Sequence, residues 1–208
     1  MSQKSLKVLK RPFYLKSAAV VAKRLLGKKL VRVVNGRRLS GIIVEVEAYL
    51  GFKDPASHTF DGHRTTRVES MYKGGGYAYV YFVYGMHFCF NVVVGKEGEG
   101  QAVLIRALEP VEGIPIMTRR RGKKGRRLAN GPAKLCQALG ISSSENGVDL
   151  THFKGLFLEE SSCSIPQSQI AAGPRIGVEY AGEAARWPLR FYIKDNKFVS
   201  KSSRRTPK

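Results

Sequence analysis

A run of alternating side chains at residues 41–50 constrains the fold of this chain most strongly. Apolar and polar residues follow one another with a period of two and β-branched residues are frequent, which predicts a β-strand. Successive side chains of a strand point to opposite faces. One face would carry Ile42, Val44, Val46 and Ala48, and the other Glu45, Glu47 and Tyr49. Such a strand would pack its apolar face on a core and line a polar cleft with the other.

Further strands and a few helices are expected on either side of this run. Residues 28–34, 77–94, 101–108 and 155–159 have strand patterns, and residues 172–178 and 188–193 resemble late strand pieces. Ser17 and Gly27 would bound one helix, Gly131 and Gly140 a second, and Pro115 would begin a third. The fold class predicted is α+β. One domain over residues 12–199, a curved antiparallel β-sheet surrounded by α-helices, would lie between a basic flexible arm (1–11) and a basic tail (200–208).

The charge of the chain indicates its partner. Among 208 residues there are 36 Lys and Arg against 16 Asp and Glu, which gives a formal net charge of +20. Such an excess favours nucleic acid, with an anionic membrane surface as the weaker alternative. No apolar run reaches the length of a membrane-spanning helix and no secretion signal is recognised, so the chain is not expected to be secreted. Three widely spaced cysteines fit free thiols, and no residue spacing predicts a metal site.

Two segments without periodicity are candidates for function. Residues 51–76 form a long stretch between two halves of the polar face, and loops of this length in compact domains are usually functional. Arg64 and Arg67 lie in it. Residues 119–127 form a basic run interrupted by glycines, for which a flexible loop is expected. This run is either a solvated loop or a phosphate-binding segment, and the net charge favours phosphate contacts by Arg119, Arg120, Arg121, Lys123 and Lys124.

Several stretches together resemble the alkyladenine (3-methyladenine) DNA glycosylase family. They are EVEAYLG (45–51), ASH (56–58), YVYFVYGM (79–86), FCFN (88–91), LIRALEP (104–110), GPAKLCQAL (131–139), RIGV (175–178) and PLRFY (188–192). They occur in the family's order from about residue 17 to residue 193. The resemblance implies a monofunctional enzyme of base-excision repair, which flips a damaged purine out of duplex DNA and hydrolyses its N-glycosidic bond with water.

The same resemblance implies roles for individual residues. Glu47 would be the general base, Arg106 would help to hold the water and the nucleotide, and the main-chain carbonyl near Val178 would bind the water. The base would lie among Tyr49, His58 and Tyr81, Asn91 would exclude guanine, and Tyr84 would fill the vacated base stack. From residue type alone, core packing remains open for the tyrosines and for Asn91, as do solvated surface roles for the glutamates.

Chemistry supports these roles. An alkylated purine is already a good leaving group, so one carboxylate can suffice where an ordinary glycosidase needs two. The lesions expected are 3-methyladenine, 7-methylguanine, hypoxanthine and ethenoadenine. The enzyme is expected to need no cofactor, to be a monomer, and to bind double-stranded DNA and no membrane. It would act in the bacterial cytoplasm at the nucleoid, or in a eukaryotic nucleus. Two rivals remain: a non-catalytic nucleic-acid-binding module, and a bifunctional glycosylase/lyase with a lysine nucleophile.

Overall fold

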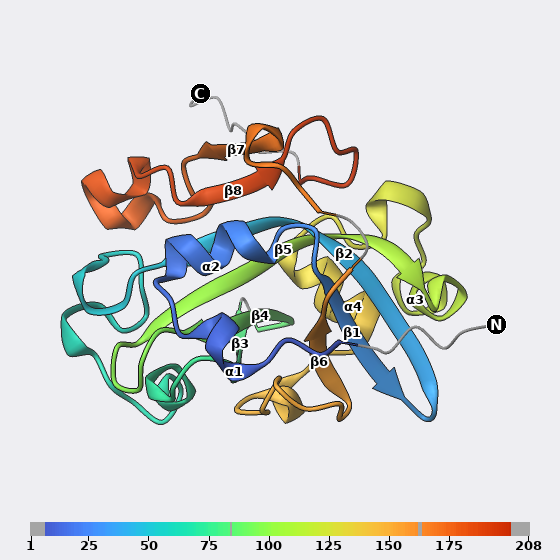
Figure 1. The fold of residues 1–208 in the computed structure, drawn as a ribbon, viewed down its shortest axis with the longest axis horizontal. Helices are drawn as coiled ribbons and strands as arrows, with labels where there is room; N and C mark the ends of the chain where they lie inside the picture. Colours follow the sequence, from blue (N-terminus) through green and yellow to red (C-terminus); the bar gives the residue numbers. More distant parts are fainter. Residues whose placement is uncertain (1–6, 84, 162–163, 201–208) are drawn as a thin grey trace.

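A computed structural model describes residues 7–83, 85–161 and 164–200. Over these residues one antiparallel sheet of eight strands organises the chain, in the order β3-β4-β5-β2-β1-β6, with β8 pairing with β2 and β7 (Figure 1). The strands are β1 (Lys29–Val34), β2 (Arg37–Tyr49), β3 (Ala78–Val83), β4 (His87–Val94), β5 (Gln101–Glu112), β6 (Leu156–Glu159), β7 (Ile170–Gly173) and β8 (Arg190–Ile193). The predicted α+β class with a curved antiparallel sheet is confirmed.

Strand β2 is the long central strand that joins the two parts of the sheet. Its first half pairs with β1 through the tight turn at Asn35 and Gly36, and residues 45–47 pair with β8 on the same side. Strand β5 follows its other side. The predicted strict alternation is wrong at one point: Ile43 is fully buried and Ile42 is only half-buried. The register shift between Ile43 and Glu45 explains this, because a bulge inserts a residue and exchanges the faces.

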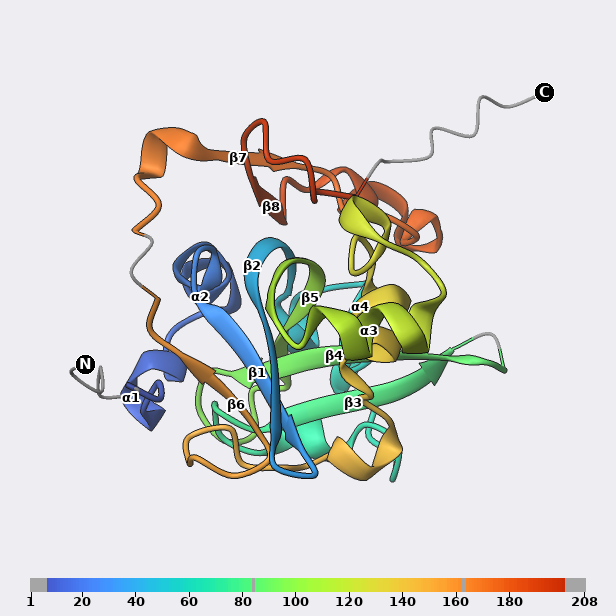
Figure 2. The same ribbon diagram turned by 90° about the vertical axis from the view of Figure 1, so that its right-hand side faces the viewer.

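Four α-helices cover the sheet within the described residues: α1 (Arg11–Tyr14), α2 (Ala18–Leu25), α3 (Ile114–Arg121) and α4 (Pro132–Leu139). Helix α2 packs on β2 and β5, α4 packs on β4 and β5, and α3 packs on α4 (Figure 2). Gly27 and Gly140 have positive φ just after α2 and α4, as the sequence predicts, because a left-handed residue closes a helix without a Cβ clash. The main core therefore lies between these helices and one face of the sheet.

Two segments differ from the sequence-based expectation. Strand β5 continues beyond Pro110 to Glu112, since β4 pairs with residues 101–104 only and leaves the Pro110 nitrogen without a partner strand on that side. Arg119, Arg120 and Arg121, expected in a flexible loop, form the last turn of α3, which ends at Gly122. Basic residues are favourable there because the C-terminal end of a helix carries partial negative charge.

Within residues 51–76 lie three short 3₁₀ turns, Gly51–Lys53, Phe60–Gly62 and Glu69–Tyr72.

The second face of the sheet carries the polar and aromatic residues. Cross-strand pairing runs from Tyr79 to Asn91, from Asn91 to Leu104, and from Leu104 to Glu47, so these side chains form one row across four strands. On the next row Tyr81 is paired with Cys89. None of the polar members belongs to the main core, which holds the opposite residues of the same strands. The expected polar face therefore exists and faces away from α2.

Candidate active site

A buried pair of glutamates shares one arginine at the centre of this face. The Arg106 side chain, from β5, places Nη1 3.1 Å from Oε1 of Glu47 and Nε 3.1 Å from Oε1 of Glu45. Both carboxylates are fully buried, and Arg106 is nearly so. The alternation of β2 brings the two glutamates to one face, and β5 supplies the countercharge from the neighbouring strand. The strand pattern predicted Glu45 and Glu47 on one face, and the family resemblance implied Arg106 in the site. Neither predicted that one guanidinium bridges both carboxylates.

Glu47 is held by three donors from three parts of the chain. Besides Arg106, the backbone N–H of Ile176 donates to Oε1 at 2.7 Å, and the Tyr49 hydroxyl donates to Oε2 at 3.0 Å. Burial nevertheless raises the pKa of Glu47 above its usual value, and the charge of Glu45 adds to that effect. A buried carboxylate that retains an affinity for protons is suited to accept a proton from water.

Glu45 is more completely satisfied than Glu47. In addition to Arg106, its Oε1 accepts hydrogen bonds from Arg190 at 3.1 Å and from the Ser200 hydroxyl at 2.8 Å, while its Oε2 accepts from the Ser200 backbone N–H at 2.7 Å. Glu45 therefore links Arg106 to Arg190 and Ser200, and Glu47 is the carboxylate with fewer donors.

A cavity of about 220 Å³ lies next to Arg106 and the Tyr49 ring. Its walls come from β2, β3, β4, β5, the start of α4 and the segment 176–180. The lining residues are Tyr49, Tyr81, Val83, His87, Cys89, Leu104, Arg106, Pro132, Ala133, Ile176, Gly177, Val178 and Tyr180. A cavity lined by apolar and aromatic side chains with a few polar groups among them is typical of a site for a small ligand.

The three aromatic residues expected around a base are brought together only in part. Tyr49 and Tyr81 line the cavity, whereas His58 packs edge-on against Tyr81 with 4.7 Å between ring centroids and lines the neighbouring open hollow formed by residues 55–68. His58 Nδ1 lies 2.8 Å from the Tyr79 hydroxyl. Burial and the nearby charge of Arg67 lower the pKa of His58 to about 4. The ring is therefore neutral near pH 7, which suits a stacking surface.

Three further predicted residues differ in what surrounds them. The buried Asn91 donates from Nδ2 to the Tyr79 carbonyl at 3.2 Å, and it is the row neighbour of the cavity residue Leu104. Val178 is buried and lines the cavity. Tyr84 lies outside the residues that the structure describes. Their roles in binding a base, water and DNA remain predictions.

The predicted phosphate-binding residues are divided by their contacts. The exposed Arg64 forms an ion pair with Glu69, and the exposed Arg67 donates to the Phe82 carbonyl at 3.2 Å. Arg120 donates to the Ala138 carbonyl, and Arg121 donates to the Leu128 carbonyl and to Gln137, so both tie α3 to neighbouring chain. Arg119, Lys123 and Lys124 are exposed, and nothing in the geometry tests whether any member of this set touches DNA.

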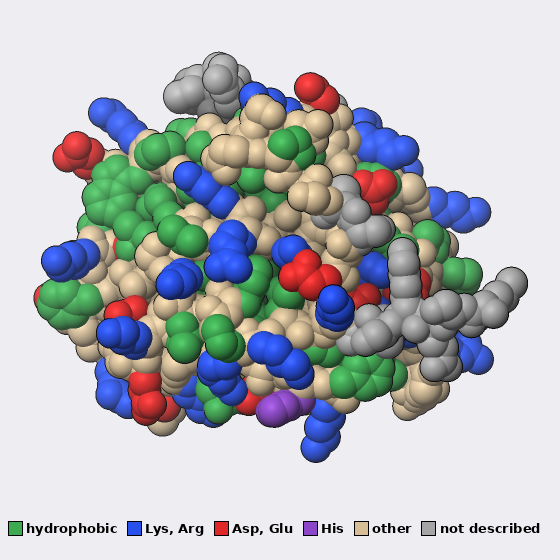
Figure 3. All heavy atoms as spheres, in the orientation of Figure 1, with side chains coloured by type: hydrophobic (Ala, Val, Ile, Leu, Met, Phe, Trp, Pro, Cys, Tyr) green, Lys and Arg blue, Asp and Glu red, His purple; other side chains and the backbone are tan. Residues whose placement is uncertain are grey.

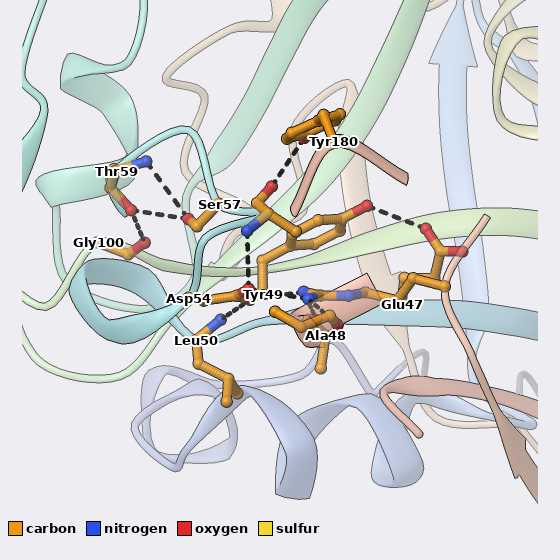
Figure 4. Close-up of polar contacts among 12 residues, drawn as sticks. Glu47, Ala48, Tyr49, Leu50, Asp54, Ser57, Thr59, Gly100 and Tyr180 are labelled. Carbon is orange, nitrogen blue, oxygen red and sulfur yellow. Dashed lines mark hydrogen bonds and ion pairs between the residues drawn. The ribbon is translucent and has the colours of Figure 1, made fainter. Parts of the chain in front are cut away.

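Sequence reasoning missed a second buried ion pair beside the cavity. Asp54 and Arg175 are fully buried and bond through both carboxylate oxygens, at 2.5 Å and 2.8 Å. The Arg175 guanidinium also lies 4.8 Å from the centre of the Tyr49 ring. Figure 4 shows how Asp54, Tyr49 and Glu47 follow one another along this edge of the site. The match at residues 175–178 covered Arg175, but its partner is 121 residues away in an unpatterned loop, so spacing could not predict the pairing.

The described ranges hold neither a metal cluster nor a spanning helix. No group of three or more His, Cys, Asp or Glu side chains in them is placed to hold a metal ion. In the same part of the chain, no helix has the length and apolar character required to cross a bilayer.

Comparisons with known proteins agree with the geometry. Residues 12–197 match the family profile described as Methylpurine-DNA glycosylase (MPG). A protein of Desulfitobacterium hafniense named "Putative 3-methyladenine DNA glycosylase" is 48% identical over 204 residues, which cover 94% of this chain and 99% of the relative. A Bacillus cereus protein of the same name is 50% identical over 200 residues, covering 91% of this chain and 97% of that protein.

Proposed function

The chain belongs to the methylpurine-DNA glycosylase family, and on that premise we propose how it releases a base and which bases it selects. It is a DNA glycosylase, a hydrolase of base-excision repair. The lesions proposed are 3-methyladenine, 7-methylguanine, hypoxanthine and ethenoadenine. The observation that carries the proposal is the buried Glu47 carboxylate, held by Arg106, Ile176 and Tyr49, three residues that line the aromatic cavity.

In the proposed reaction Glu47 activates a water molecule. The bond between the sugar C1′ and the purine nitrogen breaks, and its electron pair leaves with the base. An alkylated purine thereby loses its positive charge, whereas hypoxanthine or ethenoadenine leaves as an anion and takes up one proton from solvent. The water oxygen forms the new bond to C1′, and its proton passes to Glu47. The carboxylate and the positive sugar of the oxocarbenium-like transition state attract one another. Arg106 and the Val178 carbonyl would orient the water and the nucleotide.

The cavity would receive the base after it is rotated out of the duplex. Unstacking costs a few kcal/mol, and stacking on aromatic rings returns about 1–3 kcal/mol per base. Tyr49 and Tyr81 supply such rings, and their electron-rich faces also attract a cationic purine. His58 would join them after the edge contact with Tyr81 rearranges. Asn91 would stand against the purine edge at which guanine carries its additional amino group.

The net charge supports DNA as the partner without locating the interface. Figure 3 views the molecule from the side opposite the end of the β3–β4 hairpin, and Lys and Arg are scattered over that face among few Asp and Glu. The excess of positive charge is therefore not confined to the surface around the cavity. We place the duplex across the cavity mouth, with the protein acting as a monomer at chromosomal DNA.

The two rival functions predict different products. A lyase needs a lysine amine at the sugar, and no lysine lines the cavity among the described residues. Duplexes with one lesion each should release free base, and borohydride should leave no covalent complex with the protein. Covalent trapping would establish the lyase. A protein that releases no base from any lesion, and binds undamaged single strands as tightly as lesion duplexes, would be the non-catalytic module.

A further inference from the structure

The buried pair of Asp54 and Arg175 contacts every segment that holds Glu47 except β5. Arg175 Nη1 donates to the carbonyl of Ala48, the residue between Glu47 and Tyr49 on β2, at 3.0 Å. Its guanidinium lies against the Tyr49 ring at 4.8 Å. Arg175 is also the residue directly before Ile176, whose N–H binds Glu47. Arg175 therefore connects the Ala48 carbonyl and the Tyr49 ring to the residue that donates to Oε1 of Glu47.

Asp54 holds this arginine in one orientation. Both of its carboxylate oxygens bond to Arg175, and the same oxygens accept the backbone N–H groups of Leu50 at 2.9 Å and Ala56 at 3.0 Å (Figure 4). Leu50 directly follows Tyr49. A bidentate pair fixes the guanidinium plane as well as its position, which a lysine cannot do.

Stability alone does not account for this arrangement. A buried ion pair repays its desolvation only with good geometry, and a well-packed apolar replacement is often as stable. The contacts of this pair converge instead on Tyr49 and the residue before Ile176, that is, on two of the three groups that donate to Glu47. The Ala184 carbonyl, which accepts from Arg175 at 3.3 Å, adds a fourth anchor in the segment that follows the cavity wall.

We propose that Arg175, held by Asp54, is a positioning residue that sets the Tyr49 ring and the Ile176 N–H at their hydrogen-bonding distances from Glu47. The inference rests on the proposed function, in which Glu47 accepts the proton of water. Arg175 does not line the cavity; it acts through Tyr49 and Ile176. A displacement of about 1 Å at a catalytic group can cost about 10²-fold in rate.

Loosening this clamp has a predictable effect on Glu47. The groups that face its carboxylate or interact with its charge are Arg106 from β5, Glu45 and Tyr49 from β2, Tyr81 from β3, Cys89 from β4, and the Ile176 N–H, Arg175 and Tyr180 from the segment 175–180. If Tyr49 and Ile176 donate less well, the charged form of Glu47 loses stabilisation and its pKa rises further. The acid limb of the pH–rate profile then moves to higher pH.

The test is single-turnover base release by Arg175→Lys and Asp54→Asn, measured over pH on a 3-methyladenine or hypoxanthine duplex, together with thermal unfolding. The matched control is Arg32→Lys. Arg32 pairs with the buried Glu145 at 2.6 Å and does not line the cavity. Arg175→Lys should lose about 10-fold or more in rate at temperatures where it is folded, with the acid limb shifted upward. Arg32→Lys should lose stability without either change.

Rates and acid limbs of both site variants equal to wild type, with only a loss of thermal stability like that of Arg32→Lys, would overturn the inference. If Arg175→Lys does not fold, the acid limb of Asp54→Asn decides the question alone. Wild-type protein is measured in parallel. No base release by wild type would contradict the proposed function, whereas release by wild type together with unaffected variants would contradict the positioning role alone.

Discussion

The Tyr49 hydroxyl donates a hydrogen bond of 3.0 Å to Oε2 of Glu47, the oxygen that Arg106 and Ile176 leave free. Tyr49→Phe keeps the ring in the cavity wall and removes this donor. The pKa of Glu47 should rise further because its charged form loses a hydrogen bond. We expect the acid limb of single-turnover base release to move to higher pH, with little change in affinity for lesion duplex.

Tyr180→Phe is the control for that experiment. Tyr180 also lines the cavity, but its hydroxyl donates to the Ala56 carbonyl at 3.1 Å and not to Glu47. Its acid limb should remain where the wild-type limb lies. Equal shifts in the two variants would show that the hydroxyl of Tyr49 has no specific effect on the pKa of Glu47.

His58 gives a prediction for stability against pH. Its pKa in the folded chain is about 4, below the ordinary 6.5, so the unfolded chain binds more protons between these values. The stabilisation is therefore complete above pH 6.5 and is lost as the pH falls toward 4. Thermal midpoints measured from about pH 7 to about pH 4.5 should fall less steeply for His58→Gln than for wild type. Parallel slopes would mean that His58 titrates normally in the fold.

Asn91 should exclude guanine by its bulk and its fixed amide. Nδ2 is held by the Tyr79 carbonyl, so the side chain cannot turn aside without losing that bond. Asn91→Ser should begin to release guanine from undamaged duplex while hypoxanthine remains a substrate. Free guanine and hypoxanthine are measured side by side. Loss of hypoxanthine release without any guanine release would identify Asn91 as a structural residue of the sheet.

The exposed cations at the end of α3 and just after it should contribute to the salt dependence of DNA binding. Arg119, Lys123 and Lys124 are exposed, whereas Arg120 and Arg121 are engaged with neighbouring chain. Neutralising the three exposed residues should reduce the slope of log K against log salt by about 0.9 for each phosphate that the protein no longer neutralises. Lesion preference should not change.

The control for the salt experiment neutralises three exposed cations on other elements, Arg37, Lys154 and Lys197. Because long-range attraction falls off within about 8–10 Å at ordinary salt, these residues should leave the slope nearly unchanged if they lie away from the duplex. If both sets change the slope equally, residues 119–124 are a solvated surface segment and not a specific phosphate-binding one.

The parts of the fold that follow from local patterning were predictable. The strand patterns, the Asn35-Gly36 turn and the glycine stops at Gly27 and Gly140 depend on residues close in sequence. The bulge at Ile43 was not, because a one-residue register shift is decided by pairing with β5 across the sheet. The prediction that residues 119–121 lie in a loop was also wrong, since the glycines that suggested a loop begin only at Gly122.

The site divides in the same way. Glu45, Glu47 and Tyr49 on one face follow from alternation, and their specific roles came from the family resemblance. The partners that distinguish the two glutamates could not be predicted: Ser200 is 155 residues from Glu45, and Ile176 is 129 residues from Glu47. Only the folded sheet brings these donors together. The structure thereby makes Glu45 a poor neutral control for Glu47, because both contact Arg106.

The central claim, that Glu47 is the base, is tested most directly by Glu47→Gln. The pKa of Glu47 is raised in the fold, so its charged form opposes folding as the pH rises through its titration, and Gln removes that cost. The thermal midpoint near neutral pH should therefore not fall. Glu109→Gln is the control, a half-buried carboxylate on β5 bonded to Asn196.

The measurement is single-turnover release of 3-methyladenine or hypoxanthine from a lesion duplex, with folding checked by thermal unfolding. Loss of a general base costs about 10²–10⁴-fold, and the loss of anionic stabilisation of the sugar should bring Glu47→Gln to the upper end of that range. Binding of the lesion duplex should be retained, and Glu109→Gln should remain near the wild-type rate. A folded Glu47→Gln protein that releases base as fast as wild type would contradict the account.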